Sequence, residues 1–71
     1  MDINLVHTLQ SCLDDCDRLL REAEFDKERY HQCMSGELLK SYIQATDVSI
    51  GKIKKIRKQL YNLQFQQKLE T

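Results

Sequence analysis

The sequence predicts an all-α protein, an antiparallel two-helix hairpin that completes a bundle with a partner. Three observations support this prediction. The 71 residues include no proline and only two glycines, and helix-forming Leu, Lys, Glu, Gln and Arg dominate the composition. Apolar residues recur at alternating spacings of three and four in each half of the chain, and strand-like alternation is absent. Gly36 lies at the midpoint and suits the left-handed position just past a helix end.

The first helix is expected over residues 3–33, with Asp2 as its N-cap. The residues expected to face the second helix follow the 3–4 spacing: Val6, Leu9, Leu13, Cys16, Leu20, Ala23, Lys27, Tyr30 and Met34. Leu5, Cys12 and Leu19 form a second row beside them, seven residues apart. The apolar stripe is therefore wide, as in a bundle helix rather than in a narrow two-stranded seam.

The turn is expected at residues 34–36 and the second helix at residues 37–67. The apolar stripe of this helix consists of Leu39, Tyr42, Ile43, Thr46, Ile50, Ile53, Ile56, Leu60 and Leu63. Residues 46–51 combine β-branched residues, capping residues and a glycine, all of which lower helix propensity. A break of the second helix near Gly51, which would give three helices, is therefore an alternative.

The charge distribution favours a hairpin. Residues 1–37 carry nine acidic and four basic side chains, a net charge of −5, whereas residues 38–71 carry two acidic and seven basic ones, a net charge of +5. Folding one half back on the other neutralises both. A turn near residue 35 predicts that the numbers of facing residues add up to about 70, so that Leu20 faces Ile50.

The same register brings an acidic group of the first helix opposite a basic group of the second. Asp14, Asp15 and Asp17 are expected to face the basic residues between 52 and 57. Exposed ion pairs add at most about 1 kcal/mol each, but they help to select one register.

The basic segment 52–58 has a second interpretation, as a helix that binds nucleic acid or an anionic membrane surface. A solvated face that pairs with the acidic first helix is favoured instead, because the chain has no net positive charge to attract such a partner.

No catalytic, cofactor or metal site is expected. The cysteines and the two histidines lack the CxxC spacing of a zinc site, and no glycine-rich phosphate loop or nucleophile–base set occurs. A chain of this length is also too short to enclose a small-molecule pocket. The sequence therefore predicts a protein that is not an enzyme.

The sequence predicts a cytoplasmic protein with reduced thiols. Cys12 and Cys16 lie four residues apart on a helix, which is poor geometry for a disulfide between them, and Cys33 leaves the cysteine count odd. Neither a leader segment nor a long apolar run is apparent, so no transmembrane segment is expected.

Two helices bury only one face of each, so further apolar residues are available for a helical protein partner. The residues expected to bind it lie beside or behind the seam: Leu5, Cys12, Leu19, Phe25, Tyr61 and Phe65. The leading hypothesis is a co-chaperone or adaptor that forms a heterodimer. A self-associating four-helix-bundle dimer is the alternative.

Two family resemblances bear on the partner. The spacing of Met34, Gly36, Lys40 and Tyr42 resembles the turn region of the small co-chaperones that guard the needle subunit in type III secretion. That resemblance implies a cytoplasmic helical hairpin that packs on a tetratricopeptide-like chaperone, the pair shielding the needle protein's helix. With one residue deleted, segment 37–46 is also similar to the helical-hairpin inhibitor of sporulation histidine kinases.

Overall fold

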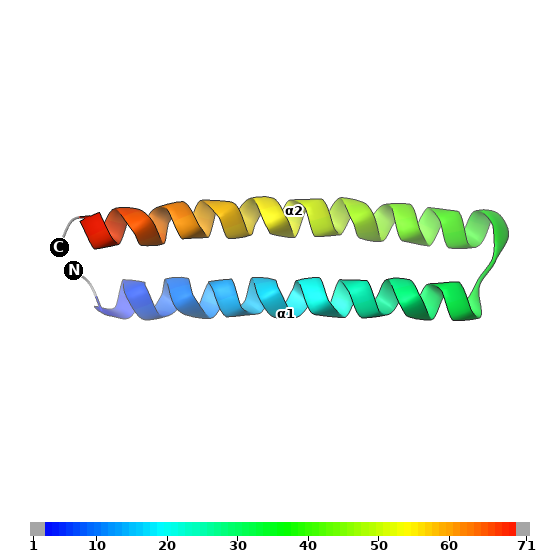
Figure 1. Cartoon of the computed structure of the whole chain (residues 1–71), viewed down its shortest axis with the longest axis horizontal. Coiled ribbons are helices and arrows are strands. Elements are labelled where there is room, and N and C mark those ends of the chain that lie inside the picture. The colour runs from blue at the N-terminus through cyan, green and yellow to red at the C-terminus, as the bar shows by residue number, and fades with distance from the viewer. Residues whose placement is uncertain (1–2, 70–71) are drawn as a thin grey trace.

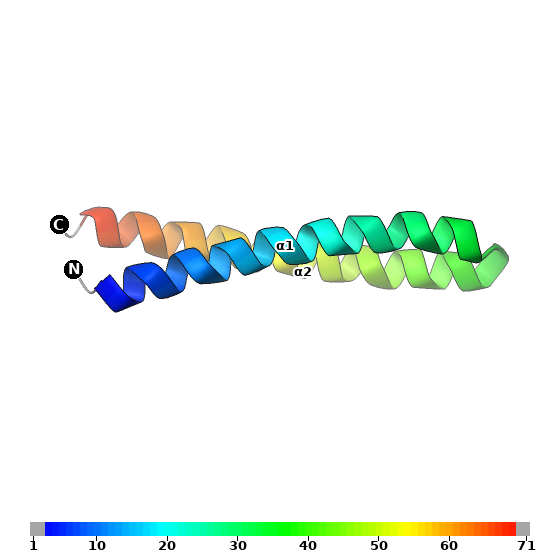
Figure 2. The ribbon, with the colours of Figure 1, turned by 90° about the horizontal axis from the view of Figure 1, so that it is seen from below.

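The computed structural model describes residues 3–69, which form two long helices joined by a short turn (Figure 1). Helix α1 spans Ile3–Cys33 and helix α2 spans Gly36–Leu69. The helices lie antiparallel in a rod of 53 × 15 × 11 Å, and Figure 2 shows them crossing as coiled-coil helices do. The predicted all-α hairpin is therefore confirmed. Asp2, the expected N-cap, lies outside the described residues.

The seam between the helices follows a heptad pattern on both sides. All of its residues are buried or half-buried: Val6, Leu9, Leu13, Cys16, Leu20, Ala23, Lys27 and Tyr30 on α1, Met34 directly after α1, and Leu39, Ile43, Thr46, Ile50, Ile53, Arg57, Leu60, Gln64 and Gln67 on α2. Within residues 3–69 the fully buried hydrophobic side chains are Leu9, Leu13, Cys16 and Ile50. The hairpin core is therefore small for a folded domain.

The register differs from the predicted one by about three residues. The hydrogen bond between Lys27 and Asp47 joins residues whose numbers add up to 74, and the ring contact between Tyr30 and Tyr42 gives 72. If the numbers of facing residues add up to about 73, every seam position of the first half of the hairpin faces a seam position of α2. If they add up to 70, only every second seam position does so. Leu20 therefore lies level with Ile53 rather than with Ile50.

The reason for this shift lies at the turn. The prediction centred the register on the middle of the connection, but the first turn of α2 projects past the end of α1 (Figure 1). The amide of Met34 donates to the carbonyl of Tyr30 at 2.9 Å, and Gly36 takes a φ of +65° as α2 begins. Seam packing, rather than the midpoint of the turn, sets which residues face each other.

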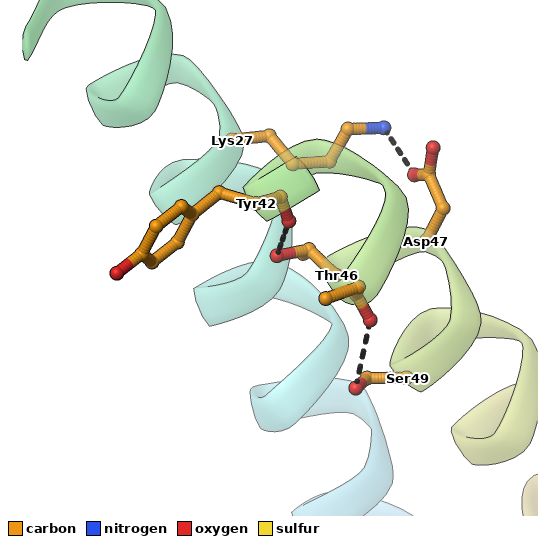
Figure 3. A network of polar contacts seen from close by, with 6 residues as sticks. Lys27, Tyr42, Thr46, Asp47 and Ser49 are labelled. Carbon is orange, nitrogen blue, oxygen red and sulfur yellow. Dashed lines mark hydrogen bonds and ion pairs between the residues drawn. The ribbon is translucent and has the colours of Figure 1, made fainter. Parts of the chain in front are cut away.

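Helix α2 is continuous through residues 46–51, and it runs from one residue before the predicted start to two residues past the predicted end. The Thr46 hydroxyl donates to the carbonyl of Tyr42 at 2.9 Å, and the Ser49 hydroxyl donates to that of Ala45 at 3.2 Å (Figure 3). These hydroxyls bond within their own helix and do not open it. The alternative with a break near Gly51 is not what the structure contains.

One of the three aspartates expected to reach α2 makes that contact. Asp17 accepts a hydrogen bond from Arg57 at 3.2 Å. Asp15 pairs within α1 with Arg18 at 3.4 Å, and Asp14 accepts from the Gln10 amide at 3.1 Å. These two lie outside the seven-residue row of Asp17 that borders the seam, and this position on α1 does not depend on the register.

Candidate protein-binding surface

The two edges that flank the seam differ in chemistry, and the first of them is polar. Three side-chain hydrogen bonds cross between the helices along this polar edge: Gln64 to Gln10 (3.1 Å), Arg57 to Asp17 (3.2 Å) and Lys27 to Asp47 (2.7 Å). Each joins a seam residue of one helix to the row just outside the seam on the other. Lys27, Arg57 and Gln64 of the seam thus find their partners by reaching toward one side of the hairpin.

Lys27 and Asp47 form the shortest of these contacts, which Figure 3 shows between the two helices. The hydrogen bond from Lys27 to the Asp47 carboxylate raises the pKa of the lysine above its ordinary value of 10.5. Partial burial lowers this pKa, and the negative charges of Asp47 and Glu24 raise it further. Folding therefore favours the protonated, charged form of the Lys27 ammonium group.

The opposite edge is apolar. Rows seven residues apart on both helices meet there, and their large apolar side chains together with one cysteine define the apolar edge: Leu5, Cys12, Leu19, Ile56 and Leu63. Cys12 is half-buried, and the other four side chains are 38–50% exposed. The hairpin therefore presents a band of apolar surface to its surroundings along one side.

The apolar edge is a continuous strip. Since facing residues add up to about 73, Leu63 lies level with residue 10 and Ile56 lies level with residue 17. The strip thus alternates between the helices in the order Leu5, Leu63, Cys12, Ile56 and Leu19. At about 1.5 Å per helical residue it is about 21 Å long, which is the length of four helical turns.

The strip ends in the half of the hairpin that carries the turn. Asp26 and Ser49 occupy the next positions of the two rows, and Asp26 pairs with Arg29 at 3.1 Å. Beyond them, the ring of Tyr42 packs on that of Tyr30 with 5.3 Å between centroids. The continuous strip is therefore confined to the part of the hairpin away from the turn, and Tyr42, which is 45% exposed in the same row of α2, is separated from it by Ser49.

The structure gathers three of the six predicted partner-binding residues and separates the others. Leu5, Cys12 and Leu19 all belong to the apolar edge. Tyr61 shares the seven-residue row of Asp47, on the polar edge. The two phenylalanines occupy outward-facing helical positions, where Phe25 is 66% and Phe65 62% exposed.

Two members of the apolar edge, Ile56 and Leu63, were assigned to the seam by the sequence analysis. The seam instead takes Arg57 and Gln64, so Ile56 and Leu63 fall at its margin. The sequence signal that could have identified Ile56 and Leu63 as edge residues is the alternation of spacings of three and four residues from Ile50 onward. This alternation places Arg57 in the seam in spite of its charge.

The other surfaces that could bind a ligand or partner are less well defined than the apolar edge. Lys52, Lys55 and Lys58 are exposed on the outer side of α2, whereas the exposed Lys54 lies in the row of Asp47 on the polar edge, so the four lysines do not form one stripe. An open groove near the turn is lined mainly by α2 residues between Gly36 and Val48. Over residues 3–69, no group of three or more His, Cys, Asp or Glu side chains is arranged to hold a metal ion.

Cys12, Cys16 and Cys33 carry free thiols, and Cys16 is buried in the seam. Neither described helix contains a stretch that is long and apolar enough to cross a bilayer. Comparison of the chain with protein-family models, with curated proteins and with solved structures gives no match. The geometry of the apolar edge is therefore the observation that bears most directly on function.

Proposed function

We propose that the chain is a non-enzymatic interaction protein, an adaptor or co-chaperone that completes a helical bundle with a helical partner. The observation that supports this proposal is the asymmetry of the hairpin. The polar contacts between the helices lie along one edge, and the half-exposed apolar strip lies along the other. A partner helix laid along the apolar edge would remove that strip from water, at about 25 cal/mol per Å² before association costs are subtracted.

The test is a matched pair of double variants. The edge variant, Leu19→Gln with Ile56→Gln, places amides on both helices at the end of the strip that lies nearest the turn. The outer-face control, Val48→Gln with Leu69→Gln, changes two side chains that are 54% and 70% exposed and face away from it. Partners are recovered from native extract with the wild-type chain, identified by mass, and titrated in purified form.

Under the proposal, the edge variant loses about 30-fold or more in affinity, because it replaces a large apolar side chain on each helix that the partner helix would bury. The outer-face control binds like the wild type. Circular dichroism shows that both variants stay helical, since the four changed residues lie outside the seam. Equal binding by both variants would exclude the apolar edge as the partner site.

The resemblance at the turn provides one specific partner to try first. A tetratricopeptide-like chaperone and a type III needle subunit, each purified, can be mixed with the hairpin and separated by size. If the hairpin acts as a needle co-chaperone, a ternary complex forms with the wild-type chain and the outer-face control but not with the edge variant. The absence of a complex with the wild type would restrict the proposal to other helical partners.

A further inference from the structure

The apolar edge has the properties needed to pack against itself. We propose that, in the absence of its helical partner, the chain covers this edge with a second copy and forms a homodimeric four-helix bundle. The inference rests on the proposed function in one respect, because both assign the apolar edge to a contact with another protein chain.

A two-fold axis that runs parallel to the helices, between two facing apolar edges, generates this bundle. Such an axis stacks α1 of one copy on α2 of the other and leaves the level of every residue along the rod unchanged. The strip of one copy therefore covers the strip of the other over its full length. All neighbouring helices become antiparallel, as in common four-helix bundles.

The charge of the two halves favours this symmetry over the alternative. Helix α1 carries seven acidic and four basic side chains, a net charge of −3, and helix α2 carries two acidic and seven basic ones, a net charge of +5. The parallel axis therefore stacks an acidic helix on a basic one. An axis perpendicular to the helices would stack α1 on α1 and α2 on α2, with like charges facing each other.

The residues just outside the strip match in the same way. The next row on α1 contains Asp15 and Glu22, and the next row on α2 contains Lys52 and Gln59; all four are exposed. Lys52 lies level with residue 21 and Gln59 with residue 14. In the bundle, Glu22 of one copy lies beside Lys52 of the other, and Asp15 lies beside Gln59, so no like charges meet.

The size of the strip indicates a weak dimer. A strip about 21 Å long across two helices, about 20 Å wide, covers roughly 400 Å² on each copy, about half of what a standard specific interface buries per partner. Micromolar dissociation is therefore expected. Such a dimer protects the apolar edge at high concentration and still yields it to a helical partner that binds more tightly.

Sedimentation equilibrium of the purified chain from about 1 μM to 1 mM, under reducing conditions, tests the inference. The wild type and the outer-face control should both pass from monomer to dimer in this range. The edge variant should remain monomeric throughout, with helicity like that of the wild type. A wild type that stays monomeric at 1 mM, or an edge variant that dimerises like the control, would overturn the proposal.

A charge exchange tests the arrangement without altering the apolar strip. Glu22→Lys alone and Lys52→Glu alone should each weaken dimerisation about 5- to 25-fold, because the symmetry repeats the pair and each exposed pair contributes up to about a factor of five. The double variant, Glu22→Lys with Lys52→Glu, should restore wild-type dimerisation. A dimer that the single reversals leave unchanged, or that the double variant does not restore, would contradict the stacking of α1 on α2.

The two proposals can fail separately. If the wild type is monomeric but binds a helical partner that the edge variant does not bind, only the homodimer proposal is refuted. In the opposite case, the wild type dimerises, the edge variant does not, and no helical partner is recovered from extract. That result would support the homodimer and count against the adaptor.

Discussion

Leu13 is the most deeply buried side chain of the hairpin, at 2% exposure, and it lies level with Leu60 across the seam. Truncation there leaves a cavity that two rigid helices cannot fill by small movements. We expect Leu13→Ala to lower the free energy of unfolding by about 2–4 kcal/mol. Urea denaturation, followed by circular dichroism at one fixed protein concentration, measures the loss.

Val48→Ala is the matched control, since it also removes methyl groups but at an outward-facing position. Alanine has the higher helix propensity, so this change should alter stability by no more than about 0.5 kcal/mol. If both substitutions cost the same, Leu13 is not in the core.

The contact between Lys27 and Asp47 gives the hairpin a pH dependence at the alkaline end. The pKa of Lys27 is raised in the folded chain, so folding favours its protonated form. The stabilising contribution is therefore fully present below the ordinary lysine value of 10.5 and is lost as the pH rises through the higher value of the folded state.

Asp47→Asn isolates this effect from other consequences of alkaline pH, because it removes only the carboxylate that pairs with Lys27. The wild type should lose its advantage over Asp47→Asn as the pH is raised from 9 to 12, and thermal melts at each pH measure the difference. A difference that stays constant across this range would mean that the two side chains do not interact in solution.

At the scale of the helices, the polar residues of the seam specify the register. Arg57, Lys27 and Gln64 occupy seam positions and find partners only at the polar edge. A slip of three residues along the partner helix would separate each from its partner and leave polar groups poorly satisfied. Their stabilising energy is modest, but they disfavour alternative pairings.

Replacing each of the two glycines with alanine should change the stability of the hairpin in opposite directions. Gly36 has a φ of +65°, which an L side chain rarely adopts, whereas Gly51 lies inside α2 with open space around an added Cβ. Gly36→Ala should destabilise the hairpin by about 1 kcal/mol. Gly51→Ala should stabilise it by about 0.5–1 kcal/mol, because alanine loses less backbone entropy in a helix. Thermal melts of the two variants should shift in opposite directions; a shift of the same sign would contradict the different roles of the two positions.

The sequence was sufficient to predict the elements but not their alignment. Composition and the 3–4 spacing indicate two helices because both are local properties of the chain. The register depends on how two distant seams match, and the apolar spacing predicts Ile56 rather than the charged Arg57 in the seam of the second helix. The same misreading placed Ile56 in the core and concealed half of the apolar edge. The family of the partner and the co-chaperone role remain proposals.

At the scale of the whole molecule, the two helices depend on each other. The four buried residues of the described chain all lie in the seam, so neither helix has a core of its own. Helical stability in proteins comes mostly from such packing rather than from propensity. The opposite charges of the two halves add a long-range attraction that is screened by salt.

This dependence predicts the behaviour of the split chain. Peptides of residues 1–35 and 36–71 should each show much less helical signal alone than in the intact protein, and an equimolar mixture should recover it as the peptides associate. Raising the salt concentration from 0.05 to 1 M should weaken recovery, because the association draws on the charges of the two halves. Circular dichroism at 222 nm during titration of one peptide into the other measures both effects. Should either peptide alone be as helical as it is in the intact chain, the seam would not be what holds that helix together, and the small core would lose its assigned role.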